Sequence, residues 1–296
     1  MDLCQPLREF KPSKKFFAGL DSDGCVFDTM EIKHKECFAP MFIKHFHLQG
    51  VSKYAREAWE FVNLYSKSRG CNRFPAVVLA LDLLRERPEV QARGVKVADS
   101  AALADWLARE KRPSNTTLTS EVKAGNKALA QVLEWSHAVN ASIEDIVRDV
   151  APFPKVRECL EKLKGEADSM VISQTPGEAL RREWAEHKIE PFVKLIAGQE
   201  MGTKTEHLKF AAVGKYAPAN ILMVGDAPGD MKAAKANGAL FYPILPHHEE
   251  QSWQSLFEEG LPRFFAGEFA GEFETRLVRE FEASLPANPP WKKQGA

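Results

Sequence analysis

The sequence predicts an α/β protein: a parallel sheet core into which an all-helical domain is inserted. Short apolar runs alternate with helix-length segments from residue 154 onward. One further apolar run, residues 16–20, stands far ahead of the others, and the intervening segment has a helical pattern almost throughout. Because a single strand cannot fold alone, we expect a discontinuous core of residues 1–28 and 151–296, with residues 29–150 as a helical cap domain.

The strands of the core are predicted from short apolar runs with acids or turn residues at their ends. The first, FFAGL at 16–20, follows two lysines and ends at DSDG. Later runs occupy residues 167–173, 192–197, 220–226 and 239–245. Helical segments at 154–164, 177–188, 204–214 and 229–237 separate them. This alternation is typical of a parallel sheet covered by helices on both faces.

The inserted segment shows helical periodicity and no strand pattern. Phe38, Phe42 and Phe46 recur every four residues, and Pro75 opens a long apolar helix at a favoured first-turn position. Beyond residue 246 the pattern weakens, so we expect a terminal helix packed on the core and a frayed PANPPWKK tail.

Composition excludes several classes of protein. Of the 296 residues 44% are hydrophobic and 27% charged, which is ordinary globular usage. Forty basic side chains nearly cancel forty-one acidic ones, so no global positive field favours nucleic acid as a partner. Five scattered cysteines without a C-x-x-C pair favour reduced thiols in the cytoplasm. No apolar run suits a signal peptide or a membrane span, and neither is expected.

Acidic residues follow two of the predicted core strands. Asp21 and Asp23 come after the first strand, and Asp226 and Asp230 come after residues 220–225. An isolated aspartate at such a place is as readily a turn or helix cap. Ligands of parallel α/β sheets, however, bind at the carboxyl ends of strands, and four carboxylates gathered there would repel each other without a cation. Ligands that are all oxygen atoms favour Mg²⁺ over zinc.

The motifs resemble those of the haloacid dehalogenase-like superfamily. DSDGCVFDT resembles its first motif and VGDAPGDMKAAKANGA its fourth. Between them, Ser173 in VISQTP and Lys204 in QEMGTKTEHLK stand where the second and third motifs are expected. The resemblance implies a Rossmann-like core with a cap, Mg²⁺ as cofactor and phosphoryl transfer as the reaction. Gln174 and Thr205 depart from the residues common at their positions in the family.

The resemblance also implies a role for each matched residue. Asp21 would be the nucleophile that becomes an aspartyl-phosphate, and Asp23 the general acid and base. Ser173 would hold phosphate oxygens and Lys204 would balance charge. The metal ligands would be Asp21, the Asp23 backbone carbonyl, Asp226 and Asp230. Taken alone, Ser173 is more readily a helix cap and Lys204 an exposed first-turn lysine, and only their positions beside the acids favour a role in the site.

Three functions remain open at this stage. A second acid two residues after the nucleophile favours oxygen leaving groups, so a phosphatase acting on a small phosphorylated metabolite is the leading hypothesis. A phosphomutase-type isomerase of the same superfamily is the alternative. A non-catalytic module that binds metal or phosphate, as receiver domains do, ranks third. The substrate and the oligomeric state cannot be predicted from the sequence.

The inserted domain is expected to lie over the strand ends as a lid and to determine specificity. Arg69, Asn72 and Arg73, in SRGCNRF, are candidates for gripping an anionic or hydroxylated substrate, and a solvated loop is an equally good interpretation. His45 and His47 are two residues apart on a helix and face different directions, which argues against a metal pair.

Overall fold

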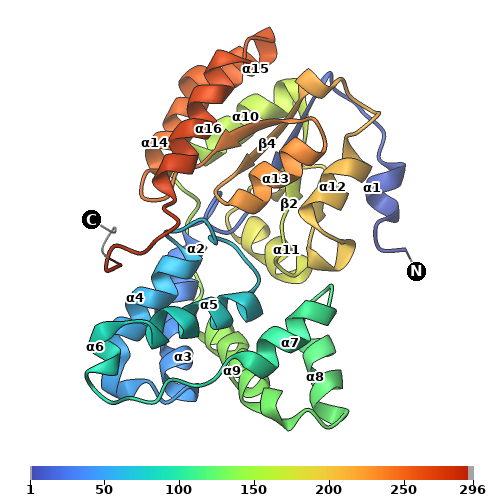
Figure 1. The fold of residues 1–296 in the computed structure, drawn as a ribbon. Helices are drawn as coiled ribbons and strands as arrows, with labels where there is room; N and C mark the ends of the chain where they lie inside the picture. The colour runs from blue at the N-terminus through green and yellow to red at the C-terminus, as the bar shows by residue number, and fades with distance from the viewer. Residues whose placement is uncertain (1, 293–296) are drawn as a thin grey trace. The chain divides into compact units, whose positions relative to one another are not determined.

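A five-stranded parallel sheet confirms the predicted α/β class (Figure 1). The computed structural model describes residues 2–292. The spatial strand order is β3-β2-β1-β4-β5. The strands are β1 (Phe16–Leu20), β2 (Ala167–Ile172), β3 (Leu195–Ala197), β4 (Ile221–Gly225) and β5 (Leu240–Pro243). The chain places β2 and β3 on one side of β1 and β4 and β5 on the other. The strand order therefore reverses between β1 and β4, and in such sheets ligands bind at the carboxyl ends of the strands at this switch point.

The chain divides into two compact units. The core unit comprises residues 2–28 and 150–284, and the helical unit comprises residues 29–149 and 285–292. Along the chain the division falls at residues 28–29, 149–150 and 284–285, so residues 285–292, which we expected in the core, group with the helical unit.

Helices cover both faces of the sheet in the core unit. They alternate with the strands as predicted: α10 (Val156–Glu166), α11 (Gly177–Glu186), α12 (Lys204–Ala211) and α13 (Pro228–Ala236). Ala18 and Leu20 belong to a buried cluster that includes Leu160 of α10. Gly19 faces the other way, because a Cβ added there would lie 3.5 Å from Leu208 of α12. All five residues of β1 are buried, as expected for a central parallel strand.

The segment after β5 is more ordered than its sequence pattern indicated. It forms α14 (Glu249–Ser255), a π-helical turn (Leu256–Gly260), α15 (Leu261–Ala266) and α16 (Glu272–Ser284). Trp253, Phe264 and Phe269 join the core cluster beside α10, so the FFAGEF stretch supplies core residues.

Asp168, at the amino end of β2, is a buried acid with a structural role. Its carboxylate accepts hydrogen bonds from the backbone N–H of Ser13 (2.7 Å) and of Lys14 (2.9 Å) and from the Tyr216 hydroxyl (2.8 Å). Burial by itself raises the pKa of Asp168, but the Ser13 and Tyr216 hydrogen bonds outweigh it and the pKa is lowered. The residue ties the segment before β1 to the end of the sheet opposite the predicted site.

The helical unit contains no strand among its described residues, 29–149 and 285–292. Its first helices are α2 (Thr29–Ile32), a π-helical turn (Lys33–Phe38), α3 (Ala39–His45), α4 (Ser52–Asn63) and α5 (Arg73–Arg85). It continues with α6 (Pro88–Gln91), α7 (Ala101–Arg109), α8 (Asn115–Lys123) and α9 (Ala130–Ile146). The Phe38, Phe42, Phe46 stripe is buried against Trp59 and Trp135, with Phe42 and Trp59 centroids 5.0 Å apart. Aromatic packing therefore forms its core.

The C-terminal tail packs on the helical unit, and the prediction that PANPPWKK frays is wrong for residues 286–292. The Trp291 ring lies edge-on to Phe61, with centroids 5.7 Å apart, and 4.3 Å from the Arg87 guanidinium. The carbonyl of Pro286 accepts a hydrogen bond from the Lys67 backbone N–H. Hydrophobic and cation–π contacts hold the segment in place. Such contacts leave no helical or strand periodicity in the sequence. The last residue of the predicted tail, 293, lies outside the described residues.

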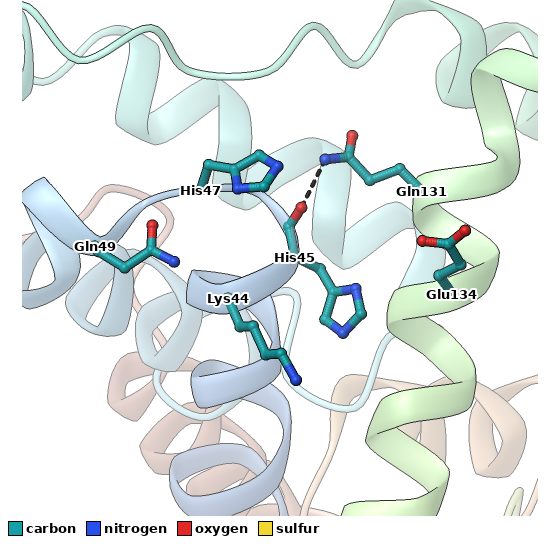
Figure 2. A pocket seen from close by; sticks show the side chains of 6 residues that line it. All are labelled: Lys44, His45, His47, Gln49, Gln131 and Glu134. Atoms are coloured by element: carbon teal, nitrogen blue, oxygen red, sulfur yellow. Dashed lines mark hydrogen bonds between the residues drawn. The ribbon is translucent and has the colours of Figure 1, made fainter.

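A pocket in the helical unit lies at the end of α3, where His45 and His47 are found (Figure 2). Gln131 donates a hydrogen bond to the His45 carbonyl (2.6 Å), and the two imidazole rings point in different directions. Within residues 2–292, neither histidine belongs to a group of side chains spaced to hold a metal. Over the same range, no helix is both long and apolar enough to cross a bilayer.

Candidate active site

Asp21 directly follows the central strand β1 at its carboxyl end. Its backbone N–H donates to the Val224 carbonyl (3.0 Å), which extends the ladder with β4 by one bond. The carboxylate is 4% exposed, and its Oδ1 accepts from the backbone N–H of Ser22 (2.8 Å). Gly24 then takes φ = +75°, a left-handed conformation that suits glycine, and the chain turns sharply. The DSDG sequence therefore fixes Asp21 at the edge of the sheet.

The loop after Asp21 is held rigidly by two tryptophans. The Trp184 indole N–H donates to the Ser22 hydroxyl (3.0 Å), and the Trp253 indole N–H donates to the Cys25 carbonyl (2.7 Å). Both tryptophans are fully buried. Large buried side chains that bond to a loop in this way fix its geometry without a ligand.

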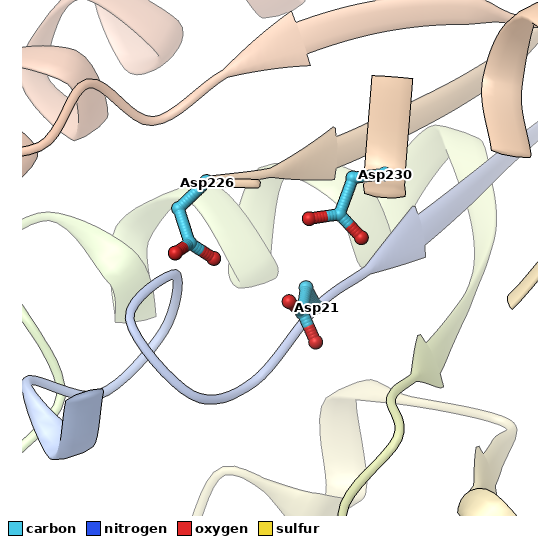
Figure 3. A group of neighbouring side chains, drawn as sticks. All are labelled: Asp21, Asp226 and Asp230. Carbon is cyan, nitrogen blue, oxygen red and sulfur yellow. The ribbon is translucent and has the colours of Figure 1, made fainter. Parts of the chain in front are cut away.

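Asp226 and Asp230 come from the end of β4 and from the first turn of α13 (Figure 3). The Asp230 carboxylate accepts from the backbone N–H of Ala227 (3.1 Å), a helix-capping bond. A Cβ added to Gly225 would lie 2.4 Å from the Asp230 Cγ. Glycine is therefore required at 225 for this carboxylate to approach the strand end.

Three of the four predicted metal-binding acids meet in space. Asp21, Asp226 and Asp230 are buried and offer carboxylate oxygens that all lie within 4.8 Å of one another. Asp23 is not part of this group; its predicted contribution to the metal was a backbone carbonyl. The segments about two hundred residues apart in the chain thus converge at one edge of the sheet, as the sequence predicted.

Lys204 lies among these acids. Its Nζ is 2.5 Å from Asp21 Oδ2 and 2.7 Å from Asp230 Oδ1. The lysine opens α12, where Thr203 and Glu206 form a capping box. It is not the exposed first-turn lysine of the alternative interpretation, because its side chain is 14% exposed and makes two ion pairs.

The local charges change the pKa values of the group. Burial alone lowers the pKa of Lys204, but the charges of Asp21, Asp230 and Asp226 outweigh it, so the lysine is held as a cation. Burial also raises the pKa of Asp230 to about 8; the Lys204 charge opposes this rise, and Asp21 and Asp226 add to it. One lysine therefore does not fully compensate three buried carboxylates.

The donor set fits a hard divalent cation. Every member of the group is a carboxylate, the ligand type that Mg²⁺ prefers. The nearby Cys25 thiol donates to the Val224 carbonyl, and burial and the surrounding acids raise its pKa, so it is no thiolate ligand for zinc. Asp21, Asp226 and Asp230 are the side chains that would hold the ion.

Ser173 directly follows β2, and its backbone N–H donates to the Ala197 carbonyl (3.0 Å). Its hydroxyl accepts from the backbone N–H of Thr175 (3.2 Å), a turn contact that precedes α11, so Ser173 is not the helix cap of the alternative interpretation. Gln174, the departure from the family pattern, donates to the Gly202 carbonyl (2.9 Å). Gln174 thus joins the loop after β2 to the loop before α12.

Thr175 is a site residue that the sequence analysis missed. Its hydroxyl donates to Asp23 Oδ2 at 2.6 Å, and its carbonyl accepts from the backbone N–H of Gln199. In the sequence, Thr175 could have been identified only from its position in VISQTP, two residues after Ser173. The Asp23 carboxylate is thereby held toward the loop after β2.

The fold and the site together define a class: a parallel α/β protein with a buried acid–lysine site at the carboxyl ends of its two central strands. Residues 111–242 match the family model described as haloacid dehalogenase-like hydrolase. This segment includes Ser173, Lys204, Asp226 and Asp230. The match confirms, over this segment, the resemblance noted from the motifs.

Several solved structures resemble this chain, all at low identity. A haloacid dehalogenase-like family hydrolase from Streptococcus pneumoniae is 14% identical, with coverage of 81% of this chain and 90% of that one and a TM-score of 0.44. A predicted phosphoglycolate phosphatase from Haemophilus somnus is 14% identical, with coverage of 78% and 86% and a TM-score of 0.45. A predicted phosphatase from Clostridium acetobutylicum is 13% identical, with coverage of 84% and 100% and a TM-score of 0.44. No curated protein matches the chain in sequence.

Proposed function

We propose that the protein is a Mg²⁺-dependent phosphatase that hydrolyses small phosphorylated metabolites through an aspartyl-phosphate on Asp21. The observation that carries the proposal is the Asp21 carboxylate, fixed at the end of the central strand, 2.5 Å from Lys204 and grouped with two further acids. A carboxylate that only caps a turn needs neither a buried lysine nor two acidic neighbours.

The first half of the reaction transfers the phosphoryl group to the protein. An Asp21 oxygen attacks phosphorus, the ester P–O bond breaks, and Asp23 gives a proton to the departing oxygen. Lys204 pairs with Asp21 and offers positive charge to the transferred group. Bound Mg²⁺ supplies the charge neutralisation that lets an anionic nucleophile approach an anionic phosphate.

The second half releases inorganic phosphate. Asp23, now a carboxylate, takes a proton from a water molecule as the water oxygen attacks phosphorus. The bond between phosphorus and the Asp21 oxygen breaks, and the free carboxylate is restored. Thr175, which donates to Asp23 at 2.6 Å, holds this acid and base in a defined orientation.

The direct test is phosphate release from a panel of phosphate monoesters with Mg²⁺. We expect the Asp21→Asn variant to lose at least about a thousandfold in kcat, since the amide cannot act as the nucleophile. The exposed Asp105→Asn, in the helical unit, is the matched control and should behave as wild type. Full activity of Asp21→Asn would refute the mechanism. Isomerisation of a sugar phosphate without net phosphate release would instead indicate the mutase alternative.

The metal site has its own test, which does not need a substrate. Mg²⁺ that binds only the folded state at about 100 times its Kd should stabilise the protein by about 2.7 kcal/mol, or a rise in Tm of about 5–10 °C. Asp226→Asn should abolish this rise, because it removes one of three converging carboxylates. A rise that is equal in wild type and Asp226→Asn would place the ion elsewhere.

A further inference from the structure

The loop after β2 (residues 173–176) and the loop before α12 (residues 198–203) carry different parts of the candidate site. The first contains Thr175, whose hydroxyl donates to Asp23 Oδ2 (2.6 Å). The second leads directly to Lys204, which lies 2.5 Å from the proposed nucleophile. The position of one loop relative to the other therefore determines where the general acid lies with respect to the lysine.

Backbone N–H groups join the loop after β2 and the start of α11 to the loop before α12. The Gln199 N–H donates to the Thr175 carbonyl (3.0 Å). The N–H of Gly177, the first residue of α11, donates to the Glu200 carboxylate (3.2 Å). A Cβ added to Gly198 would lie 2.5 Å from the Gly177 nitrogen, so the two backbones approach each other where neither has a side chain.

The Gln174 side chain adds a connection at the far end of the loop before α12. Its Nε2 donates to the Gly202 carbonyl (2.9 Å) and to the Ser173 carbonyl (3.2 Å). The amide is thus held by two backbone carbonyls, although Gln174 is an exposed residue. Ordering a long side chain costs conformational entropy, so a glutamine that only faced solvent would not be held in this way.

The carbonyl that Gln174 holds belongs to a strained residue. Gly202 has φ = +116° and ψ = −162°, a backbone conformation that is essentially restricted to glycine. It immediately precedes Thr203, which caps α12 together with Glu206. Lys204 is the first residue of that helix. Holding the Gly202 carbonyl therefore fixes the point from which the lysine side chain extends.

We infer that Gln174 is a positioning residue: it fastens the loop after β2 to the loop before α12, so that Lys204 and the hydrogen-bond partner of Asp23 keep their places together. The inference rests on the proposed function and deepens it. Gln174 acts through Gly202 and makes no contact with the substrate. The chain thus has a use for glutamine at a position where it departs from the family pattern.

Kinetics of Gln174→Met test the inference, because methionine keeps the length of the side chain and lacks the donor. We expect kcat to fall about tenfold, since small displacements of reacting groups reduce the rate by such factors. KM should stay within about twofold of wild type, and the fall in kcat should be equal for all phosphate esters that the enzyme hydrolyses. A rise in KM with unchanged kcat, or a loss confined to some esters, would overturn the inference, because a residue that contacts the substrate behaves in that way.

Gln91→Met is the matched control. Gln91 is an exposed glutamine of the helical unit that also donates to a backbone carbonyl, that of Arg85 (2.7 Å). This variant should have the kcat of wild type. An equal fall in kcat in Gln91→Met and Gln174→Met would overturn the inference.

Gly198→Ala separates the same two loops by a different route, because its Cβ cannot lie 2.5 Å from the Gly177 nitrogen. We expect a fall in kcat with little change in KM, as in Gln174→Met. In the double variant the two effects on kcat should be less than additive, since both changes break one connection. Fully additive effects would overturn the inference. If Gly198→Ala does not fold, Gln174→Met, at an exposed position, decides.

Hydrogen exchange tests the connection without a substrate. The backbone N–H groups of Gln199 and Gly177, which donate from one loop region to the other, should exchange at least about fivefold faster in Gln174→Met than in wild type. The Asp21 N–H, which donates to the Val224 carbonyl, is the internal reference and should keep its rate. Unchanged rates at both groups would overturn the inference even if esters are hydrolysed. If no ester is hydrolysed, the proposed function fails, and the exchange rates alone decide whether Gln174 fastens the loops.

Discussion

Gly225 and Asp230 show how single residues make the acidic site possible. The missing Cβ at 225 leaves room for the Asp230 carboxylate, which an alanine would meet at 2.4 Å. Lys204 then bridges Asp230 and Asp21 with contacts of 2.7 and 2.5 Å. Gly225, the last residue of β4, is thus a steric requirement for the site, and Asp226 after it is a candidate ligand.

Thr175 gives a prediction at the same scale. Under the proposed mechanism, Thr175→Val leaves the Asp23 carboxylate without a 2.6 Å hydrogen bond, so its orientation is less defined. We expect kcat to fall about tenfold with little change in KM, a part of the usual general acid–base contribution. Steady-state kinetics on the best ester measures both constants.

The conservative variant supplies the control. Thr175→Ser keeps the hydroxyl and should retain most of the wild-type kcat. Wild-type kcat in Thr175→Val, or an equal loss in both variants, would show that the hydroxyl does not position Asp23.

At the scale of elements, helix starts deliver the charged residues. Lys204 opens α12 behind the Thr203–Glu206 capping box, and Asp230 closes the first turn of α13. Both helices follow short connections from the carboxyl ends of strands. A side chain in the first turn therefore reaches the same edge of the sheet as the acid after β1.

The inner face of α12 carries a buried histidine that predicts a pH effect. Burial lowers the pKa of His207 to about 4, whereas the unfolded chain binds the proton near pH 6.5. Because the pKa of His207 is lower in the folded chain, the contribution of this residue to the free energy of unfolding is fully present above pH 6.5. It is lost progressively as the pH drops toward 4. From pH 7.5 to pH 5 this residue alone should cost about 2 kcal/mol.

Urea denaturation at the two pH values, followed by circular dichroism, measures this cost. Between pH 7.5 and pH 5, the free energy of unfolding of His207→Leu should fall by about 2 kcal/mol less than that of wild type. His137→Leu, at an exposed position on α9, is the control and should behave as wild type. The same acid dependence in wild type and His207→Leu would assign the effect to other groups.

At the scale of the whole molecule, the chain passes between its two units three times. The passages lie near residues 28, 149 and 284, and the third brings the tail onto the helical unit. Lys292 pairs with Glu86 (2.5 Å), and the Trp291 ring adjoins Phe61 and Arg87. The last described residues thus contribute to the stability of a unit that is mainly built from residues 29–149.

Replacing the tail tryptophan tests this contribution. Trp291→Ala should destabilise the helical unit by about 2 kcal/mol, through lost ring packing and a lost cation–π contact. The Trp291 Nε1 is buried and has no hydrogen-bond partner within residues 2–292, so Trp291→Phe should cost much less. Thermal unfolding of both variants provides the comparison. Equal stability of Trp291→Ala and wild type would mean that the tail does not support the unit.

Sequence alone determined the alternation of strands and helices, the position of the insertion, and the identity of Asp21, Ser173, Lys204, Asp226 and Asp230 as candidates. These features are local: periodicity of 2 or 3.6 residues, turn residues, and short motifs at strand ends. These local features identify the residues that follow the strands. Because parallel strands run in the same direction, those residues all lie at the same edge of the sheet.

Only the tertiary structure decided the contacts between distant segments. Thr175 meets Asp23 across 152 residues, Trp253 supports the Cys25 carbonyl across 228, and Trp291 packs against Phe61. No periodicity encodes such pairs, since they depend on side-chain direction and packing after the chain has folded.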